Sequence, residues 1–510
     1  MADSRLKNAT RNAVFAVLLK LYQTVVPFFV RTVFIYTLGM QYVGLNGLFS
    51  SILGVLNLAE LGVGSALIFS MYKPVAEHDT PMICALMNFY KKCYRIIGCV
   101  IAGAGLALMP FLKYLIKSDL PADINLYVLY LINLAGTVST YFLFAYKICL
   151  FNAHQRNDIN SKISFCVETV KYAIQIGALV LFRNYYFYII VLPVCSIVSN
   201  LITAALANKT YPEYQSKGKL NKEQVSTISK KISALFIVKI GSVVLNSVDN
   251  IVISAFLGLT VLGLYSNYNY IVSSVISIIG LLTGSMIASL GNSVATESKQ
   301  KNYNDFLKLS FWNFWLVGWC TICLVCLSQH FIRIWVGAEN ILPFGMVILF
   351  ASYFYVLQSN QVAGAYKDAA GIWESDRFRP LATAGTNLIC NLIMVQFIGL
   401  YGIVLSTVVS LLIVNTSWLI HNVCKLVFEK GMREYVLYWI RNFGITLLAG
   451  VVCYRICSMM PETGLGWFLA KGIVCVIAPN LVFLLCYFRT KSFNDSKDVV
   501  LKIYRNILHK

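Results

Sequence analysis

Cationic and amide side chains interrupt two otherwise apolar stretches of the sequence. Lys20 and Arg31 lie eleven residues apart in the first stretch, and Lys239, Asn246 and Asn250 follow in a later one. Spacings of seven and eleven residues return a side chain to the same face of an α-helix. Arginine and lysine supply positive charge and hydrogen-bond donors, the chemistry that binds a phosphate or another anion. We therefore expect two polar helix faces able to bind an anionic group.

Two carboxylates and a proline complete the set of candidate residues. Glu60 and Asp249 lie deep in apolar stretches, where each could neutralise a neighbouring cation or bind a proton or sodium ion. Pro27 lies between Lys20 and Arg31, and a proline inside a helix removes a backbone donor and favours a kink. We expect ion pairing or ion coupling at the carboxylates and a hinge at Pro27.

The elements that position these residues are transmembrane helices. Hydrophobic residues make up 58% of the 510-residue chain and charged residues 13%, proportions that no soluble protein of this size shows. Because about 20 apolar residues span the hydrocarbon core, the sequence predicts an all-α polytopic membrane protein with about 14 spans. The predicted spans are 12–37, 43–71, 94–112, 124–150, 163–182, 185–207, 233–257, 260–290, 307–329, 342–366, 380–398, 401–421, 436–459 and 465–488.

The sequence also repeats itself. LGMQYVGL at Leu38 to Leu45 recurs as LGLTVLGL at Leu257 to Leu264, and the same offset of 219 residues carries Lys20 onto Lys239. Six spans separate equivalent positions, which predicts two parallel lobes related by a pseudo-twofold axis, with a polar chamber at their interface. The predicted domains are an N-lobe at 1–208, a cytoplasmic linker at 209–232, a C-lobe at 233–425, and two extra helices with a tail at 426–510.

Basic residues in the connections predict the orientation. With the N-terminus in the cytoplasm, the outer connections hold only Lys113, Lys117, Arg183, Arg333 and Arg455, while most of the 42 Lys and Arg lie in the inner connections. This bias follows the positive-inside rule and places both termini in the cytoplasm. The net charge of +20 therefore describes the inner face of a membrane protein, and we expect no nucleic-acid partner.

The fifteen cysteines lie almost entirely in the apolar stretches, so we expect no disulfide framework. Cys320, Cys323 and Cys326 have metal-motif spacing, but this part of the sequence offers no fourth ligand. The outer connections are short and hold no paired-carboxylate or nucleophile-base motif. We therefore expect no metal, no cofactor and no enzyme activity.

Longer motifs link the chain to a known family. SSILGVLNLAELGVGSAL at Ser50 to Leu67, with the preceding Arg31, and NSVDNIVISAFLGLTVLGLYS at Asn246 to Ser266 resemble the multidrug/oligosaccharidyl-lipid/polysaccharide (MOP) exporter superfamily. The resemblance is greatest to the Wzx-type flippases. It implies alternating-access transport of undecaprenyl-pyrophosphate-linked oligosaccharide across a bacterial cytoplasmic membrane for O-antigen, capsule or exopolysaccharide synthesis. It also implies membrane lipids, polysaccharide polymerases and glycosyltransferases as partners, with H⁺ or Na⁺ as coupling ion.

Three alternatives stay open. A lipid II flippase shares a pyrophosphate-linked lipid substrate, so a cationic chamber suits it equally. A multidrug antiporter of the MATE type exports mostly organic cations, which Lys20, Arg31 and Lys239 would repel. A membrane polysaccharide polymerase or ligase is an alternative of another class, and the short outer connections argue against it.

Overall fold

The computed structural model describes residues 2–494, apart from 61, 118–119, 285 and 491–492. Within these residues the backbone forms helices and no strands, which confirms the predicted all-α class. The chain divides into two compact units, with the boundary between Ser266 and Asn267. We refer to them as unit 1 and unit 2.

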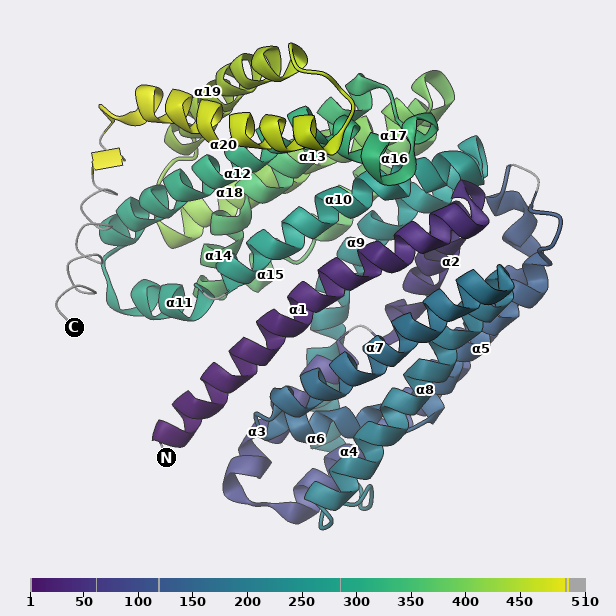
Figure 1. Cartoon of the computed structure of the whole chain (residues 1–510). Helices are drawn as coiled ribbons and strands as arrows, with labels where there is room; N and C mark the ends of the chain where they lie inside the picture. Colours follow the sequence, from purple (N-terminus) through teal and green to yellow (C-terminus); the bar gives the residue numbers. More distant parts are fainter. Residues whose placement is uncertain (1, 61, 118–119, 285, 491–492, 495–510) are drawn as a thin grey trace. The chain divides into compact units, whose positions relative to one another are not determined.

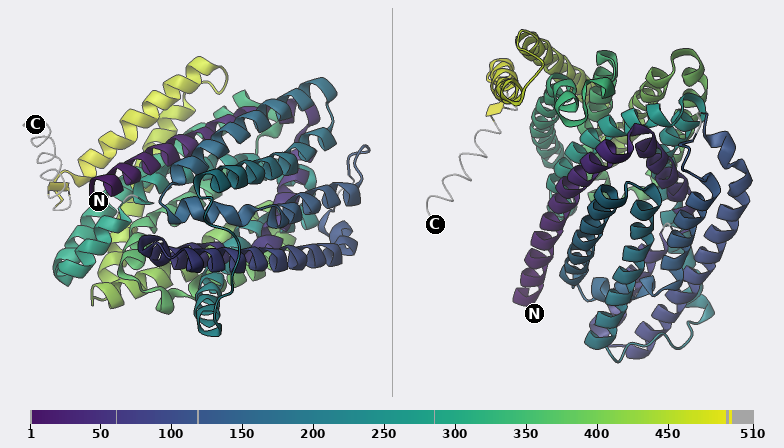
Figure 2. Two further views of the ribbon diagram at one scale, coloured as in Figure 1. Left: turned by 90° about the horizontal axis from the view of Figure 1, so that it is seen from below. Right: turned by 45° about the vertical axis from the view of Figure 1, so that its right-hand side comes forward.

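Unit 1 is a bundle in which α1 packs against α7, α7 against α8, and α8 against α5 (Figures 1 and 2). Asparagines at 125, 184 and 221 accept backbone N–H bonds at the N-termini of α5, α8 and α9, as is usual for N-caps. The helices are α1 (Ala2–Leu38), α2 (Met40–Leu56), η1 (Asn57–Glu60), α3 (Val63–Glu77), α4 (Thr80–Leu108), η2 (Met109–Leu115), α5 (Leu126–Phe142), η3 (Ala145–Lys147), α6 (Ile148–Ala153), α7 (Asn157–Phe182), α8 (Tyr185–Thr210) and α9 (Lys222–Leu257).

Helix α10 (Leu259–Gly284) begins in unit 1 and continues into unit 2. In unit 2 the long α12 packs against α13, α19 and α20 (Figure 1). The other elements are α11 (Ile287–Thr296), α12 (Lys299–Val336), η4 (Ala338–Asn340), α13 (Phe344–Ser359), α14 (Gln361–Ala370), α15 (Trp373–Asp376), α16 (Arg379–Ile398), α17 (Leu400–Ser410), the π-helical η5 (Leu411–Thr416), α18 (Ser417–Asn422), the π-helical η6 (Val423–Val427), α19 (Arg433–Ser458) and α20 (Leu465–Tyr487).

The repeat seen in the sequence recurs in the backbone at the same offset of 219 residues. Helix α1 ends at residue 38 and α9 at 257, α3 ends at 77 and α11 at 296, and α4 begins at 80 and α12 at 299. Gly39 has φ 97° and ψ 176°, and its equivalent Gly258 has φ 93° and ψ 173°. These positive φ values favour glycine, so both copies need it at the same break.

The two copies of the repeated motif also contact each other reciprocally inside unit 1. A Cβ on Gly44 would lie 1.9 Å from the Leu259 carbonyl oxygen, and one on Gly263 would lie 2.3 Å from the Met40 carbonyl oxygen. Gly44 and Gly263 are repeat equivalents, as are Met40 and Leu259. Glycine at both positions therefore allows the starts of α2 and α10 to approach closely, with a local twofold relation between the contacts.

Ten described helices are long and apolar enough to cross a membrane, or eleven if the bent pair Leu126–Phe142 and Ala145–Ala153 is one span. This supports a multi-pass membrane protein, with fewer counted spans than the fourteen predicted. The three other predicted spans fall on interrupted elements, α2–η1–α3, α10–α11 and α13–α14. The lobe boundaries at 208, 233 and 425 stay predictions, and α9 begins at Lys222 rather than at residue 233.

Candidate functional site

The first group of candidate residues lies on α1. Lys20 and Arg31 are half-buried, and α1 runs as one helix through Pro27 between them. Next to Lys20, Gln23 donates to a Glu168 carboxylate oxygen at 2.8 Å, which joins α1 to α7. This bond therefore restrains the part of α1 that carries Lys20, where α1 packs against α7. The hinge at Pro27 stays a prediction.

The second group lies on α9 and contacts α2 and α3. The Lys239 ammonium donates to the Ser65 hydroxyl at 3.3 Å, and the Asn250 amide donates to the Ser51 hydroxyl at 2.8 Å. Asn250 occupies the repeat position of Arg31, so one copy carries a cation where the other carries an amide. The side chain of Asn246 lies outside the described part of the structure.

The two predicted carboxylates differ in burial, since Asp249 is buried and Glu60 is half-buried. Asp249 on α9 is only 6% exposed. Glu60, in η1, accepts hydrogen bonds from the Tyr94 hydroxyl at 2.5 Å and from the Tyr141 hydroxyl at 2.6 Å. Tyr90 donates in turn to Tyr94 at 2.9 Å. Such donors stabilise a carboxylate without a neighbouring cation, an arrangement that sequence spacing could not reveal.

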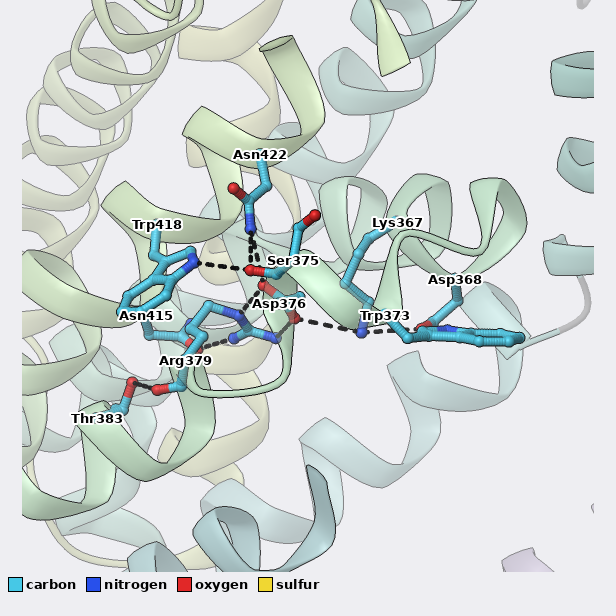
Figure 3. Close-up of polar contacts among 10 residues, drawn as sticks. All are labelled: Lys367, Asp368, Trp373, Ser375, Asp376, Arg379, Thr383, Asn415, Trp418 and Asn422. Carbon is cyan, nitrogen blue, oxygen red and sulfur yellow. Dashed lines mark hydrogen bonds and ion pairs between the residues drawn. The ribbon is translucent and has the colours of Figure 1, made fainter. Parts of the chain in front are cut away.

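Unit 2 holds a charged cluster that the sequence analysis missed. Arg379 donates to both oxygens of Asp376, from Nε at 2.7 Å and from Nη2 at 2.7 Å (Figure 3). The Lys367 ammonium lies 3.6 Å from Asp376 and 2.9 Å from Asp368. Asp376 is 4% exposed. Two cations thus share two carboxylates, and charge is balanced inside the cluster.

The π-helical segment η5 completes this cluster. Asn415 in η5 accepts a hydrogen bond from Arg379, and the Asn422 amide donates to the Ser375 carbonyl at 3.2 Å (Figure 3). Arg379 and Asn415 also line a cavity of about 400 Å³, together with Asn360 and Asp368. The sequence signal for this cluster is the short run of charges at 374–379, which lies between the predicted spans 342–366 and 380–398.

An apolar groove lies elsewhere in unit 2, with a volume of about 540 Å³. Side chains of α12, α13 and α19 line it, among them Ile322, Ile348 and Leu447, and Arg455 lies among the lining residues. A groove of this kind can take an alkyl chain, while the guanidinium can contact an anionic group.

The sequence of the chain matches the model of a known protein family. A family model described as polysaccharide biosynthesis protein matches residues 9–288, which include every candidate residue named on α1, η1 and α9. No curated protein sequence matched the chain.

Solved structures resemble the chain over most of its length. The lipid II flippase MurJ, in an inward closed conformation, has a TM-score of 0.67 at 14% identity, covering 93% of this chain and 98% of that chain. An inward-facing multidrug resistance MATE family transporter of the MOP superfamily has a TM-score of 0.61 at 12% identity, covering 84% and 99%. A MOP superfamily transporter from Pyrococcus furiosus, described by a binding pocket of reversed polarity, has a TM-score of 0.53 at 12% identity, covering 81% and 94%. At these identities the likeness shows the fold, and it confirms the predicted MOP-type fold.

Proposed function

The chain belongs to the polysaccharide biosynthesis protein family, and on that premise we propose that it is a flippase for undecaprenyl-pyrophosphate-linked oligosaccharide. It moves the headgroup from the cytoplasmic to the outer leaflet of a bacterial cytoplasmic membrane, with both termini in the cytoplasm. Its product supplies O-antigen, capsule or exopolysaccharide synthesis. The substrate comes from glycosyltransferases and passes to a polymerase.

The observation that carries this proposal is the set of cations inside the spans of unit 1. Lys20 and Arg31 lie within α1 and Lys239 lies within α9, and the Lys239 ammonium donates to the Ser65 hydroxyl. Intramembrane cations are costly unless they serve a polar pathway. A pyrophosphate supplies the negative charge and the acceptor oxygens that such cations bind.

Alternating access gives these residues their roles. Arg31, Lys20 and Lys239 bind the pyrophosphate, and Asn250 and Asn246 donate to it or to the first sugar. The lipid tail stays in the bilayer while the headgroup crosses. Asp249 or Glu60 takes up a proton or sodium ion, whose gradient drives the exchange. No bond in the substrate is made or broken, so the protein acts as a transporter and not as an enzyme.

A deletion strain tests the proposal. Cells lacking the protein should accumulate lipid-linked oligosaccharide on the cytoplasmic face and lose the surface polysaccharide, and the wild-type gene should restore both. Accumulation of lipid II instead would assign the chain to peptidoglycan precursors. Normal surface polysaccharide in the absence of a redundant flippase would contradict the proposal, and protein-dependent efflux of cationic dyes would favour the MATE-type alternative.

A further inference from the structure

Unit 2 brings together four buried cysteines from three helices that pack against one another. Cys326 lies on α12, Cys453 and Cys457 lie four residues apart on α19, and Cys475 lies on α20. Their four sulfur atoms all lie within 4.8 Å of one another. The Cys326 and Cys453 sulfurs are 3.9 Å apart, and those of Cys453 and Cys475 are 3.8 Å apart.

These separations fit the coordination sphere of a single metal ion. Zinc binds cysteine sulfur at about 2.3 Å in a tetrahedron, so two ligand sulfurs lie about 3.8 Å apart. A disulfide would need about 2.05 Å between sulfurs, and a four-iron cluster would need the sulfurs spread around a cubane. We propose that Cys326, Cys453, Cys457 and Cys475 bind one Zn²⁺ ion as a structural tetrathiolate site.

A buried cation beside the cluster supports the proposal independently. Lys471 is 4% exposed and lies one helical turn before Cys475 on α20. Within the described residues no hydrogen bond or ion pair engages its ammonium group. A zinc ion with four thiolates carries a net charge of −2, and the neighbouring ammonium reduces it to −1, so the cation favours the occupied site.

The site would hold the two C-terminal helices, α19 and α20, against α12. Two ligands come from one face of α19, at the i and i+4 spacing that brings side chains together. Helices α12 and α19 also line the apolar groove, so a bound ion would fix two of its walls. Of the three cysteines with motif spacing on α12, only Cys326 belongs to the site. The other ligands lie more than a hundred residues further along the chain.

Metal analysis of the full-length protein tests the proposal. The untagged protein, purified in detergent under reducing conditions without chelator, should hold one zinc per chain by mass spectrometry of the elements. Replacement by Co²⁺ should give the charge-transfer and d–d absorption of a tetrahedral tetrathiolate. The double variant Cys453→Ser/Cys457→Ser should lose the zinc, while Cys320→Ser, on the same helix but outside the cluster, should keep it.

A second measurement applies if the double variant fails to fold. A zinc chelator should lower the melting temperature of the wild type and of Cys320→Ser by the same amount, and added Zn²⁺ should restore it. Wild-type protein without zinc would overturn the proposal, as would zinc retained in the double variant. Iron or copper in place of zinc, or disulfides among the four cysteines, would equally overturn it.

Discussion

The candidate site of unit 1 and the charged cluster of unit 2 both hold charged side chains, but different groups surround those charges. In unit 2, Asp376 accepts two hydrogen bonds from Arg379 and forms an ion pair with Lys367. The charges within this cluster therefore balance one another. In unit 1, Lys239 contacts a serine and Glu60 contacts two tyrosines, so these charges are held by neutral groups. A balanced cluster stabilises the fold, whereas separated charges can engage a ligand or an ion.

The largest expected effect concerns the buried aspartate of unit 1. If Asp249 carries the coupling ion, Asp249→Asn should abolish gradient-driven transport, because the neutral amide cannot exchange a proton or bind sodium as a carboxylate does. Substrate binding and membrane abundance should stay near wild type, and Asp249→Glu should keep part of the activity. Transport by reconstituted protein under an imposed H⁺ or Na⁺ gradient measures this. Loss of folded Asp249→Asn protein would assign the aspartate to a structural ion pair instead.

The buried aspartate of unit 2 should show the opposite pattern. Asp376→Asn leaves Arg379 and Lys367 without their shared carboxylate, and breaking a buried pair costs about 3–5 kcal/mol. We expect a clear drop in melting temperature in detergent. The matched control is Asp305→Asn, which removes a half-exposed pair with Lys308 at 3.5 Å and should cost about 0–1 kcal/mol. Equal stability of the two variants would contradict the structural role of the charged cluster of unit 2.

A smaller effect is expected for the cationic face of α1. Arg31→Ala removes a charge-assisted contact to the pyrophosphate worth about 1.5–3 kcal/mol, or about ten- to hundredfold in transport. Arg31→Lys should recover part of the rate, because lysine keeps the charge without the planar fork. Complementation of a deletion strain at normal expression measures this. Full complementation by Arg31→Ala would exclude Arg31 from the substrate site.

The slightest effect is expected at the loop between α6 and α7 in unit 1. Burial lowers the pKa of His154, as does His78, while a hydrogen bond to the Leu150 carbonyl and the charge of Glu213 raise it. The unfolded chain, with a pKa of about 6.5, therefore binds a proton before the folded protein does. The contribution of His154 to the stability of the folded protein should be fully present above the unfolded pKa. It should be lost as the pH falls through the folded pKa. Between about pH 8 and pH 5, the melting temperature of His154→Gln should change less with pH than that of the wild type.

The sequence predicted the helical membrane class, the family and the repeat, because apolar runs and a fixed offset are local signals. The offset of 219 residues predicted the equivalence of Lys20 and Lys239, and the backbone repeats at Gly39 and Gly258 with nearly the same dihedral angles. Helical spacing also selected Lys20 with Arg31 as one face.

The contacts between helices could not be predicted from the sequence. Spacing predicts which residues share a face but does not identify what that face meets. The bond from Tyr94 to Glu60, the bond from Arg379 to Asn415 and the approach of Cys326 to Cys453 each join segments distant in sequence. Interrupted spans such as α2–η1–α3 were also read as continuous, since hydropathy does not register a break in backbone hydrogen bonding.

The measurement that tests the central claim most directly is translocation by purified protein in liposomes. Undecaprenyl-pyrophosphate-linked oligosaccharide with a fluorescent sugar is placed in both leaflets, and quencher or lectin added outside reports the fraction exposed. Under an ion gradient, wild-type protein should move the headgroup across the bilayer, and Arg31→Ala should slow it about ten- to hundredfold. The account would be contradicted if the headgroup crossed no faster than in protein-free vesicles while the same vesicles showed protein-dependent transport of a cationic dye.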